Sequence, residues 1–418
     1  PNYYAVDLLD YGVKAEMTAS ARSGMFRFTY PESDDAFILL DMDHTLWWKC
    51  RWANLRLEDD HTLSGYKLVQ GWGPERHVYF TAEFSVPISD FGIMQGGKRV
   101  CYDTSRFRSD REAWGEDLKF WVRFATREEE QVTVRVAISS VDPDGARGNL
   151  RETDGLSFDE IRRRGEELWE TELSRFTVEG PARTKETFYT SAYRCFLSPF
   201  LFQDADGRFL EHDKSIGRAE GFTNYTTFSL WDTYRAAMPL MTILHPEKMP
   251  DVINTMLAIA DEQGRLPVWH LWGNETDCMV GNPGIPVVAD AIVKGIGGFD
   301  RERAFEALVK TAMNEERGNG LRMKYGYIPC DLFNEAVAYD MEYALADGAV
   351  ARAAEALGKS EEAARFTERS HSYRHYFDPT TGFMRGRDSK GGWRTPFNPF
   401  ASTHRADDYC EGNAWQYT

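Results

Sequence analysis

Glu411 is the residue best suited to acid–base chemistry, because it lies in an aromatic run close to Tyr409, Trp415 and Tyr417. A carboxyl group against aromatic rings loses hydration, which favours its protonated form, and a general acid needs that form. The structural alternative is a Glu in the first turn of a helix that Asp408 caps. The residues alone leave both interpretations open.

A second candidate site is the run 227–235, which contains Trp231, Asp232 and Arg235. A carboxylate in the first turn of a helix is stabilised by free backbone N–H groups and stays ionised. Asp232 could therefore accept hydrogen bonds from sugar hydroxyls while the indole of Trp231 packs on the sugar ring. Ser229 could cap this helix. The alternative, which the periodicity favours, is structural: Asp232 is an acidic first-turn residue that pairs with Arg235 three residues later.

The run 264–283 is a third candidate, because it combines polar and aromatic residues in one loop. It holds Trp269 and Cys278, and binding and structural roles are equally open for both. Glu275 or Asp277 could ligate a metal, but their spacing is not diagnostic. Cys278 has no paired His nearby, which argues against a thiol nucleophile.

Glu342 and Asp347 are a fourth pair of acids, five residues apart on an expected helix. That spacing places them on different faces, so we expect them to form no catalytic pair by themselves.

Composition limits the classes of ligand. The 418 residues include 66 acids against 49 Lys and Arg, a formal charge of −17, which argues against nucleic acid or anionic membranes. Aromatic residues make up 14%, including 12 Trp, and flat aromatic faces suit sugars. No apolar run is long enough to span a bilayer.

The candidate sites all follow a region rich in expected strands. Residues 1–155 carry short β-branched and aromatic runs bounded by turn signals, which predicts an antiparallel β-sandwich. The predicted strands include 25–30, 36–40 (a short buried run), 77–84, 120–124 and 132–138.

From residue 156 the pattern becomes helical. Ser157 and Glu160 form a capping box that predicts a linker helix over 156–182. Residues 183–418 are expected to form an α/α toroid or barrel rather than a compact bundle, because long aromatic loops separate the helices. Predicted helices are 184–202, 229–243, 247–262, 284–296, 301–315, 334–357 and 359–376. The six Cys lack ligand spacing and are expected to be buried free thiols.

The candidate segments make the sequence resemble glycoside hydrolase family 92, the calcium-dependent, exo-acting, inverting α-mannosidases. The segments that carry the resemblance are 227–235 (TFSLWDTYR), 266–269 (LPVW), 278–281 (CMVG), 288–291 (VADA), 325–329 (YGYIP) and 411–417 (EGNAWQY). The strands of the sandwich, among them 65–67, 78–80, 84–85 and 138–140, agree with it.

The resemblance implies an N-terminal sandwich, a linker helix and an (α/α)6 barrel, of which residues 183–418 would be the first part. It also implies hydrolysis of terminal α-mannose from mannans or N-glycans with inversion. Glu411 matches the family's general acid. Trp231 and Asp232 match residues that bind the terminal mannose, and Cys278 lies in a segment near the entrance of the substrate-binding site. We also expect Arg235, Trp269 and Trp415 to contact substrate, although the chain has Asn282 where relatives have His.

The family's Ca2+ holds hydroxyls of the terminal mannose, but its ligands and the catalytic base are expected in a C-terminal region that these 418 residues lack. The chain is therefore interpreted as an internal portion of a longer enzyme, which needs the remaining C-terminal part. By resemblance it is extracellular or periplasmic. Two alternatives stay open: another (α/α)6 glycosidase, glucosidase-like or trehalase-like, and a non-catalytic glycan-binding protein on a decayed hydrolase scaffold.

Overall fold

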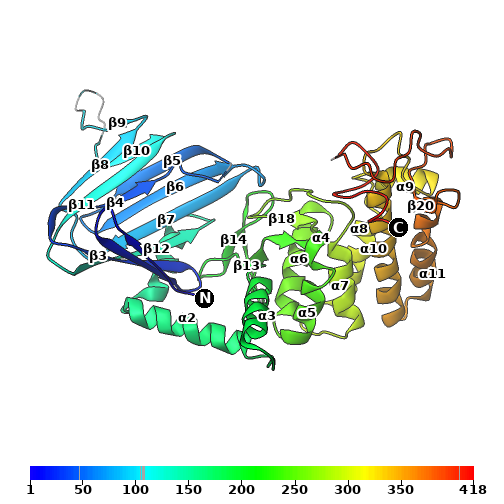
Figure 1. The fold of residues 1–418 in the computed structure, drawn as a ribbon, viewed down its shortest axis with the longest axis horizontal. Helices are drawn as coiled ribbons and strands as arrows, with labels where there is room; N and C mark the ends of the chain where they lie inside the picture. The colour runs from blue at the N-terminus through cyan, green and yellow to red at the C-terminus, as the bar shows by residue number, and fades with distance from the viewer. Residues whose placement is uncertain (47, 104, 106–108, 404) are drawn as a thin grey trace. The chain divides into compact units, whose positions relative to one another are not determined.

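The computed structural model describes residues 1–46, 48–103, 105, 109–403 and 405–418, and these fold into two compact units (Figure 1). Unit 1 comprises Pro1–Gly221 and Trp272–Asn274. Unit 2 comprises Phe222–Leu271 and Glu275–Thr418. Strands dominate unit 1 and helices dominate unit 2.

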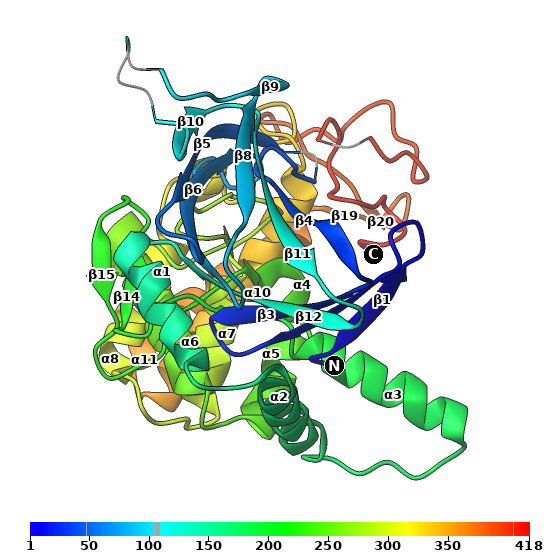
Figure 2. The same ribbon diagram turned by 90° about the vertical axis from the view of Figure 1, so that its left-hand side faces the viewer.

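The larger part of unit 1, as far as its residues are described, consists of two antiparallel sheets. Among the described residues the larger sheet has eight strands in the order β1-β2-β3-β12-β7-β6-β5-β10, and the smaller has four in the order β4-β11-β8-β9. Figure 2 shows β11 and β8 of the smaller sheet side by side, as their pairing requires. The strands are β1 (Tyr4–Leu8), β2 (Val13–Ala19), β3 (Ser23–Tyr30), β4 (Ser33–Asp41), β5 (Lys49–Leu57), β6 (Thr62–Gln70), β7 (Arg76–Phe84), β8 (Asp90–Gln95), β9 (Lys98–Arg99), β10 (Glu112–Gly115), β11 (Leu118–Thr126) and β12 (Glu130–Ser139).

The two sheets bury a common core between them. Phe120 and Val122 of β11 are buried together with Leu55 and Leu63 of the larger sheet, because alternate side chains of a strand point to one face. This packing confirms the predicted sandwich.

The prediction that 36–40 is a buried run is wrong. Ala36 is buried, but Phe37 is 43% and Leu39 55% exposed. The reason is that β4 belongs to an antiparallel sheet with one face on the core, so its side chains point alternately toward the core and toward solvent.

Three α-helices follow the strands in unit 1: α1 (Pro143–Leu150), α2 (Phe158–Leu173) and α3 (Ala182–Cys195). The capping box predicted for α2 is confirmed, because Ser157 and Glu160 bond each other's backbone N–H groups. Phe158 and Ile161 bury the helix against Met25 of β3. Shorter elements are η1 (Arg151–Thr153), β13 (Phe200–Leu201), β14 (Arg208–Leu210) and β15 (Ile216–Arg218).

Unit 2 is mainly helical. Its helices are α4 (Leu230–Thr233), α5 (Ala237–Leu244), α6 (Met249–Gln263), α7 (Gly284–Val293), α8 (Arg301–Ala312), α9 (Asn319–Tyr325), α10 (Ala336–Ala356), α11 (Ser360–Arg369) and η2 (Ser372–His375). Its short strands are β16 (Tyr225–Thr226), β17 (Phe228–Ser229), β18 (Trp269–His270), β19 (Phe377–Asp378) and β20 (Phe383–Met384). A β-sandwich followed by a helical unit confirms the predicted fold class.

Several predicted helix bounds differ from the structure. The helix predicted over 229–243 is two helices, α4 and α5, and the predictions over 184–202 and 359–376 run past the ends of α3 and α11. The helix α9 was not predicted, since it has only 7 residues and Gly at both caps.

A buried ion network fastens α10. Arg322 of α9 donates to Asp340 at 2.7 Å and to Asp347 at 2.6 Å, and all three residues are at most 4% exposed. Ser372 and Tyr376 also donate to Asp340, at 2.7 and 2.9 Å. Because residues 340 and 347 are seven apart, they lie on one helix face. One side of α10 is therefore held by charge as well as by apolar packing.

The six Cys are free thiols, as predicted. They are not all buried, however, because Cys101 and Cys195 are exposed. In the described part of the chain no helix combines the length and the apolar character needed to cross a bilayer.

Glu16 of β2 is a buried carboxylate whose charge the fold stabilises. It accepts hydrogen bonds from Arg27 at 2.8 and 2.9 Å and from Tyr3 at 2.7 Å. The bonds from Arg27, with a smaller contribution from Tyr3, lower the pKa of Glu16 to about 2. A depressed folded-state pKa stabilises the fold above the unfolded value, and this stabilisation is lost as pH falls through the folded value.

We predict that Glu16→Gln lowers the free energy of unfolding by about 2–3 kcal/mol at pH 7. The difference from wild type should shrink as pH falls from about 4.5 toward 2, as measured by urea unfolding across that range. Glu166→Gln, which removes an exposed pair with Arg162, is the control and should cost at most about 0.5 kcal/mol. A loss at Glu16 that is independent of pH would contradict the electrostatic explanation.

Candidate functional site

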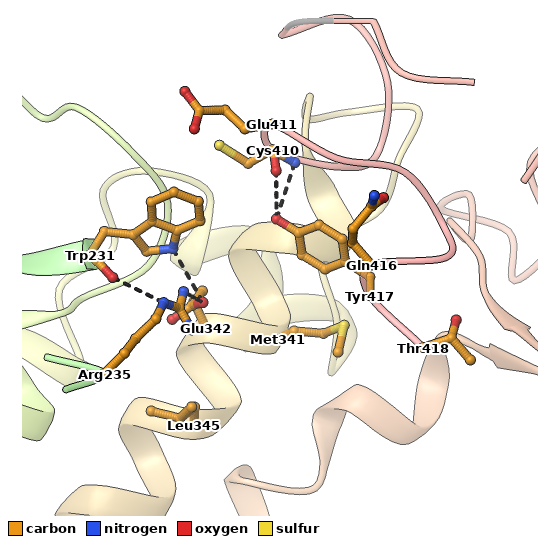
Figure 3. A pocket seen from close by; sticks show the side chains of 10 residues that line it. All are labelled: Trp231, Arg235, Met341, Glu342, Leu345, Cys410, Glu411, Gln416, Tyr417 and Thr418. Carbon is orange, nitrogen blue, oxygen red and sulfur yellow. Dashed lines mark hydrogen bonds and ion pairs between the residues drawn. The ribbon is translucent and has the colours of Figure 1, made fainter. Parts of the chain in front are cut away.

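A pocket of about 470 Å3 lies in unit 2, where α4, α10 and the C-terminal loop meet (Figure 3). It is lined by Trp231, Arg235, Met341, Glu342, Leu345, Cys410, Glu411, Gln416, Tyr417 and Thr418. Three of the predicted site residues, Trp231, Arg235 and Glu411, therefore line one cavity although up to 180 positions separate them in the sequence.

The short strand β17 and the helix α4 bring Trp231 and Arg235 to the pocket. β17 pairs with β18 through Ser229 and Trp269, so the chain enters α4 from a fixed position. The guanidinium of Arg235 lies 5.1 Å from the centre of the Trp231 ring, and its Nε donates to the backbone oxygen of Trp231 at 3.1 Å. The two side chains form one wall.

The helix cap and the ion pair proposed for this segment are both wrong. Ser229 makes no side-chain cap, and its hydroxyl donates to Asp232 instead. Arg235 does not pair with Asp232 but forms an ion pair with Glu342 at 2.6 Å. The exposed Asp232 is not among the residues that line the pocket.

Glu342 of α10 is the polar centre of the pocket wall. Its Oε1 accepts from Trp231 Nε1 at 3.2 Å and from Arg235 Nη2 at 2.6 Å, and its Oε2 accepts from the Tyr234 hydroxyl at 2.7 Å. Burial, followed by the negative charge of Glu342, raises the pKa of Tyr234, so this phenol stays a donor. Both oxygens of Glu342 are therefore engaged by neighbouring side chains.

Sequence reasoning did not select Glu342 as a site residue. Its helical position correctly separated it from Asp347, which is buried in the Arg322 network. Nothing in the local sequence shows that its partners are Trp231 and Arg235, more than 100 residues earlier.

The C-terminal loop presents Glu411 at the pocket. Glu411 is exposed and has a φ of +47°, a left-handed conformation that is uncommon outside Gly. The Tyr417 hydroxyl donates to the backbone oxygen of Cys410 at 2.9 Å and accepts from its N–H at 3.3 Å. This clamp holds the residue directly before Glu411.

The aromatic residues around Glu411 are arranged differently from the prediction. The Trp415 ring, 57% exposed, packs edge-on against Phe383 at 5.0 Å and lies 5.8 Å from Phe400, and Tyr409 is buried against Tyr417. The loop contains no helix, so the alternative of a first-turn Glu that Asp408 caps is wrong. Asp408 is buried and pairs with Arg394.

The remaining predicted residues lie elsewhere in unit 2. Trp269 is buried in β18, and Cys278 is half-buried. Burial and the carboxylate of Glu335 raise the pKa of Cys410 to about 12, so this thiol beside the pocket is protonated and not a nucleophile.

Acidic residues of the loop 264–283 form hydrogen bonds and ion pairs with other residues of the same loop. Glu275 accepts from the backbone N–H groups of Val268 and Trp269, both at 2.8 Å, and Asp277 pairs with Arg265 at 2.6 Å. Within the described ranges no three His, Cys, Asp or Glu side chains group closely enough to hold a metal. The residues present thus do not fit a calcium site by themselves.

The pocket has the chemistry of a sugar site. An indole face offers a surface for C–H groups, and charged side chains offer partners for hydroxyls. Its two carboxylates differ, because Glu342 is engaged by three donors whereas Glu411 is exposed. Glu411 is therefore the carboxyl better placed to exchange a proton with a ligand.

Comparison with known proteins gives concordant matches. The model of the glycosyl hydrolase family 92 catalytic domain matches residues 145–418, and that of the family 92 N-terminal domain matches residues 1–139. A curated protein of Arthroderma benhamiae, described as an uncharacterized secreted glycosidase, is 24% identical over 432 residues, which cover 93% of this chain and 50% of that protein.

Solved structures are also similar, among them two from Bacteroides thetaiotaomicron. A family GH92 α-mannosidase from Bacteroides thetaiotaomicron in complex with mannoimidazole is 53% identical with a TM-score of 0.98, over 100% of this chain and 56% of that chain. A family GH92 inverting mannosidase from the same organism is 28% identical with a TM-score of 0.90, over 99% of this chain and 56% of that chain. The chain thus spans about half the length of these relatives.

Gly281 allows the loop to approach the pocket wall. Its φ is +77°, and a Cβ at this position would lie 2.4 Å from Cβ of Glu342. We predict that Gly281→Ala lowers the free energy of unfolding by about 1 kcal/mol through backbone strain and by a further 1–3 kcal/mol or so through the clash.

The matched control is Gly358→Ala, since Gly358 has a φ of +72° and no atom within 4 Å of the added Cβ. Urea unfolding of both variants separates strain from contact. Equal losses in the two variants would mean that the loop does not press on Glu342.

Proposed function

The chain belongs to glycosyl hydrolase family 92, and from this premise we propose that its protein removes terminal α-linked mannose from mannans or N-glycans by inverting hydrolysis. The names of the two Bacteroides relatives, an α-mannosidase and an inverting mannosidase, support this substrate and this stereochemistry. The observation that carries the proposal is the exposed Glu411 in one pocket with Trp231 and Arg235.

In the proposed reaction Glu411 is the general acid. Its proton passes to the glycosidic oxygen as the bond from that oxygen to the anomeric carbon breaks. A water molecule attacks the anomeric carbon from the opposite face and gives its proton to a carboxylate base, so the configuration inverts. Such pairs of carboxyl groups are about 6.5–9.5 Å apart, which leaves room for the water.

The base is not assigned to a described residue. Glu342 is unsuited to that role, because a base must be free to take a proton from water and both oxygens of Glu342 already accept hydrogen bonds from neighbouring side chains.

Substrate contacts are proposed for the other predicted residues. The indole of Trp231 stacks on the terminal sugar, and the guanidinium of Arg235 donates to its hydroxyls. Asp232 accepts hydroxyl hydrogen bonds. Trp269, Cys278 and Trp415 stay proposed contacts on the basis of the family resemblance; none of them is among the pocket-lining residues.

Calcium dependence is proposed from the family resemblance. Because no suitable cluster occurs among the described residues, we assign the Ca2+ ligands to none of them and derive no step through the ion. We also propose an extracellular or periplasmic location, which the description of the Arthroderma relative as secreted supports.

We predict that Glu411→Gln lowers kcat of the full-length protein by about 100-fold or more on an unactivated α-mannobiose. The loss should be much smaller on 2,4-dinitrophenyl α-mannoside, because that leaving group needs no protonation. Initial rates on both substrates test this, with proton NMR to identify β-mannose as the first product. Glu361→Gln, an exposed residue of α11, is the control.

Equal losses on the two substrates would reject Glu411 as the acid. Hydrolysis of aryl α-glucosides in place of α-mannosides would favour a glucosidase-like enzyme. Binding of mannosides without turnover would favour a non-catalytic glycan-binding protein.

A second prediction concerns the metal. Treatment of the full-length protein with EGTA should abolish mannose release, and added Ca2+ should restore it whereas Mg2+ should not, since Mg2+ prefers smaller, strictly octahedral sites. Undiminished activity after exhaustive chelation would remove calcium from the proposal.

A further inference from the structure

Glu342, Trp231 and Arg235 form a closed ring of interactions in the pocket wall (Figure 3). The indole N–H of Trp231 donates to Glu342, Arg235 donates to the same carboxylate oxygen, and Arg235 also donates to the backbone oxygen of Trp231. The guanidinium of Arg235 is thus held at two points, and Trp231 is held through its indole N–H and its backbone oxygen. A closed ring of this kind restricts rotation of both the indole and the guanidinium.

The carboxylate at the centre of this ring accepts hydrogen bonds at both of its oxygens. Tyr234 donates to its second oxygen at 2.7 Å, and the Glu342 side chain is only 13% exposed. An ionised carboxyl group at such a site must be paired, because its hydration is largely lost. Its negative charge also pairs with the guanidinium of Arg235, which is 45% exposed.

The support beneath Glu342 is rigid. The helix α10 is fixed on another face by Asp340 and Asp347 in the Arg322 network. Gly281 allows the loop 278–281 to come so close that a Cβ there would collide with the first carbons of Glu342. The side chain is therefore confined at its base by packing and at its end by hydrogen bonds.

From this geometry we propose that Glu342 is the positioning residue of the pocket: it sets the Trp231 ring and the Arg235 guanidinium in the orientation in which they bind the sugar. The inference rests on the proposed function only in so far as the ligand is a mannoside. Glu342 neither gives nor takes a proton, and its effect reaches the substrate through its two neighbours.

The test uses Glu342→Gln in the full-length protein, with two readouts. The first is the ¹⁹F spectrum of protein labelled with 5-fluorotryptophan, in which Trp231→Phe identifies the Trp231 signal. The second is the measurement of KM and kcat, each determined separately, with α-mannobiose as the substrate. Gln keeps the size of Glu but cannot pair with a guanidinium or accept at both ends.

We expect the Trp231 signal to shift or broaden and KM to rise about tenfold, with kcat within about twofold of wild type. This is the pattern of weakened binding, and it differs from the kcat loss expected for Glu411→Gln. Tyr234→Phe, which removes only the bond to the second oxygen, should raise KM by about threefold or less. Glu355→Gln, on the same helix and paired with Arg352, should change neither readout.

An unchanged Trp231 signal in Glu342→Gln overturns the positioning role, whatever the kinetics show. If Glu342→Gln shifts the Trp231 signal but leaves KM unchanged, the orientation of Trp231 and Arg235 does not contribute to sugar binding, and that part of the proposal is overturned. If the wild-type protein releases no mannose but the signal shifts, the proposed function fails while the positioning of Trp231 by Glu342 stands. Loss of folding is recognised from the other Trp signals, and Tyr234→Phe then provides the test through the same signal.

Discussion

The site depends on a buried guanidinium, that of Arg322, held between the carboxylates of Asp340 and Asp347. Removing either acid would leave a buried charge without full compensation, which typically costs about 3–5 kcal/mol. Because both acids belong to α10, the pairing fixes the rotation of that helix about its axis. The direction in which Glu342 points follows from this rotation.

A single helix thus serves two purposes. The face with Asp340 and Asp347 is closed to water and contributes rigidity, whereas Glu342 reaches a pocket that a ligand can enter. Carboxylates on one element have different roles because their surroundings differ. Because the buried network fixes the helix, the side chains that line the pocket can keep a defined orientation without being needed for the stability of the fold.

The pocket shows the same separation between its two glutamates. Glu342 is engaged by three donors and acts on its neighbours, whereas Glu411 lies exposed on a loop held by the Tyr417 clamp at Cys410. A group that must exchange a proton with a ligand has to be accessible, and a group that orients other side chains has to be hydrogen-bonded to them. The structure assigns these contrasting environments to residues of the same type.

Much of the architecture follows from local patterns. Alternation in β11 and the capping box at Ser157 act between near neighbours, so the sandwich and α2 could be predicted without tertiary information. The predictions were wrong where tertiary packing determines burial or the end of a helix, as at the edge strand β4 and at the break between α4 and α5. Periodicity reports which residues are apolar, and it does not report whether anything covers them.

The candidate site divides in the same way. Residue types and motifs were sufficient to select Trp231, Arg235 and Glu411, which line one pocket. The structural alternative paired Arg235 with Asp232, three residues away, whereas its partner is Glu342, 107 residues away. Sequence spacing describes contacts within one helix turn, whereas hydrogen bonds and ion pairs form between any groups that the packed chain brings within about 3 Å. Only the tertiary fold could therefore bring these side chains together.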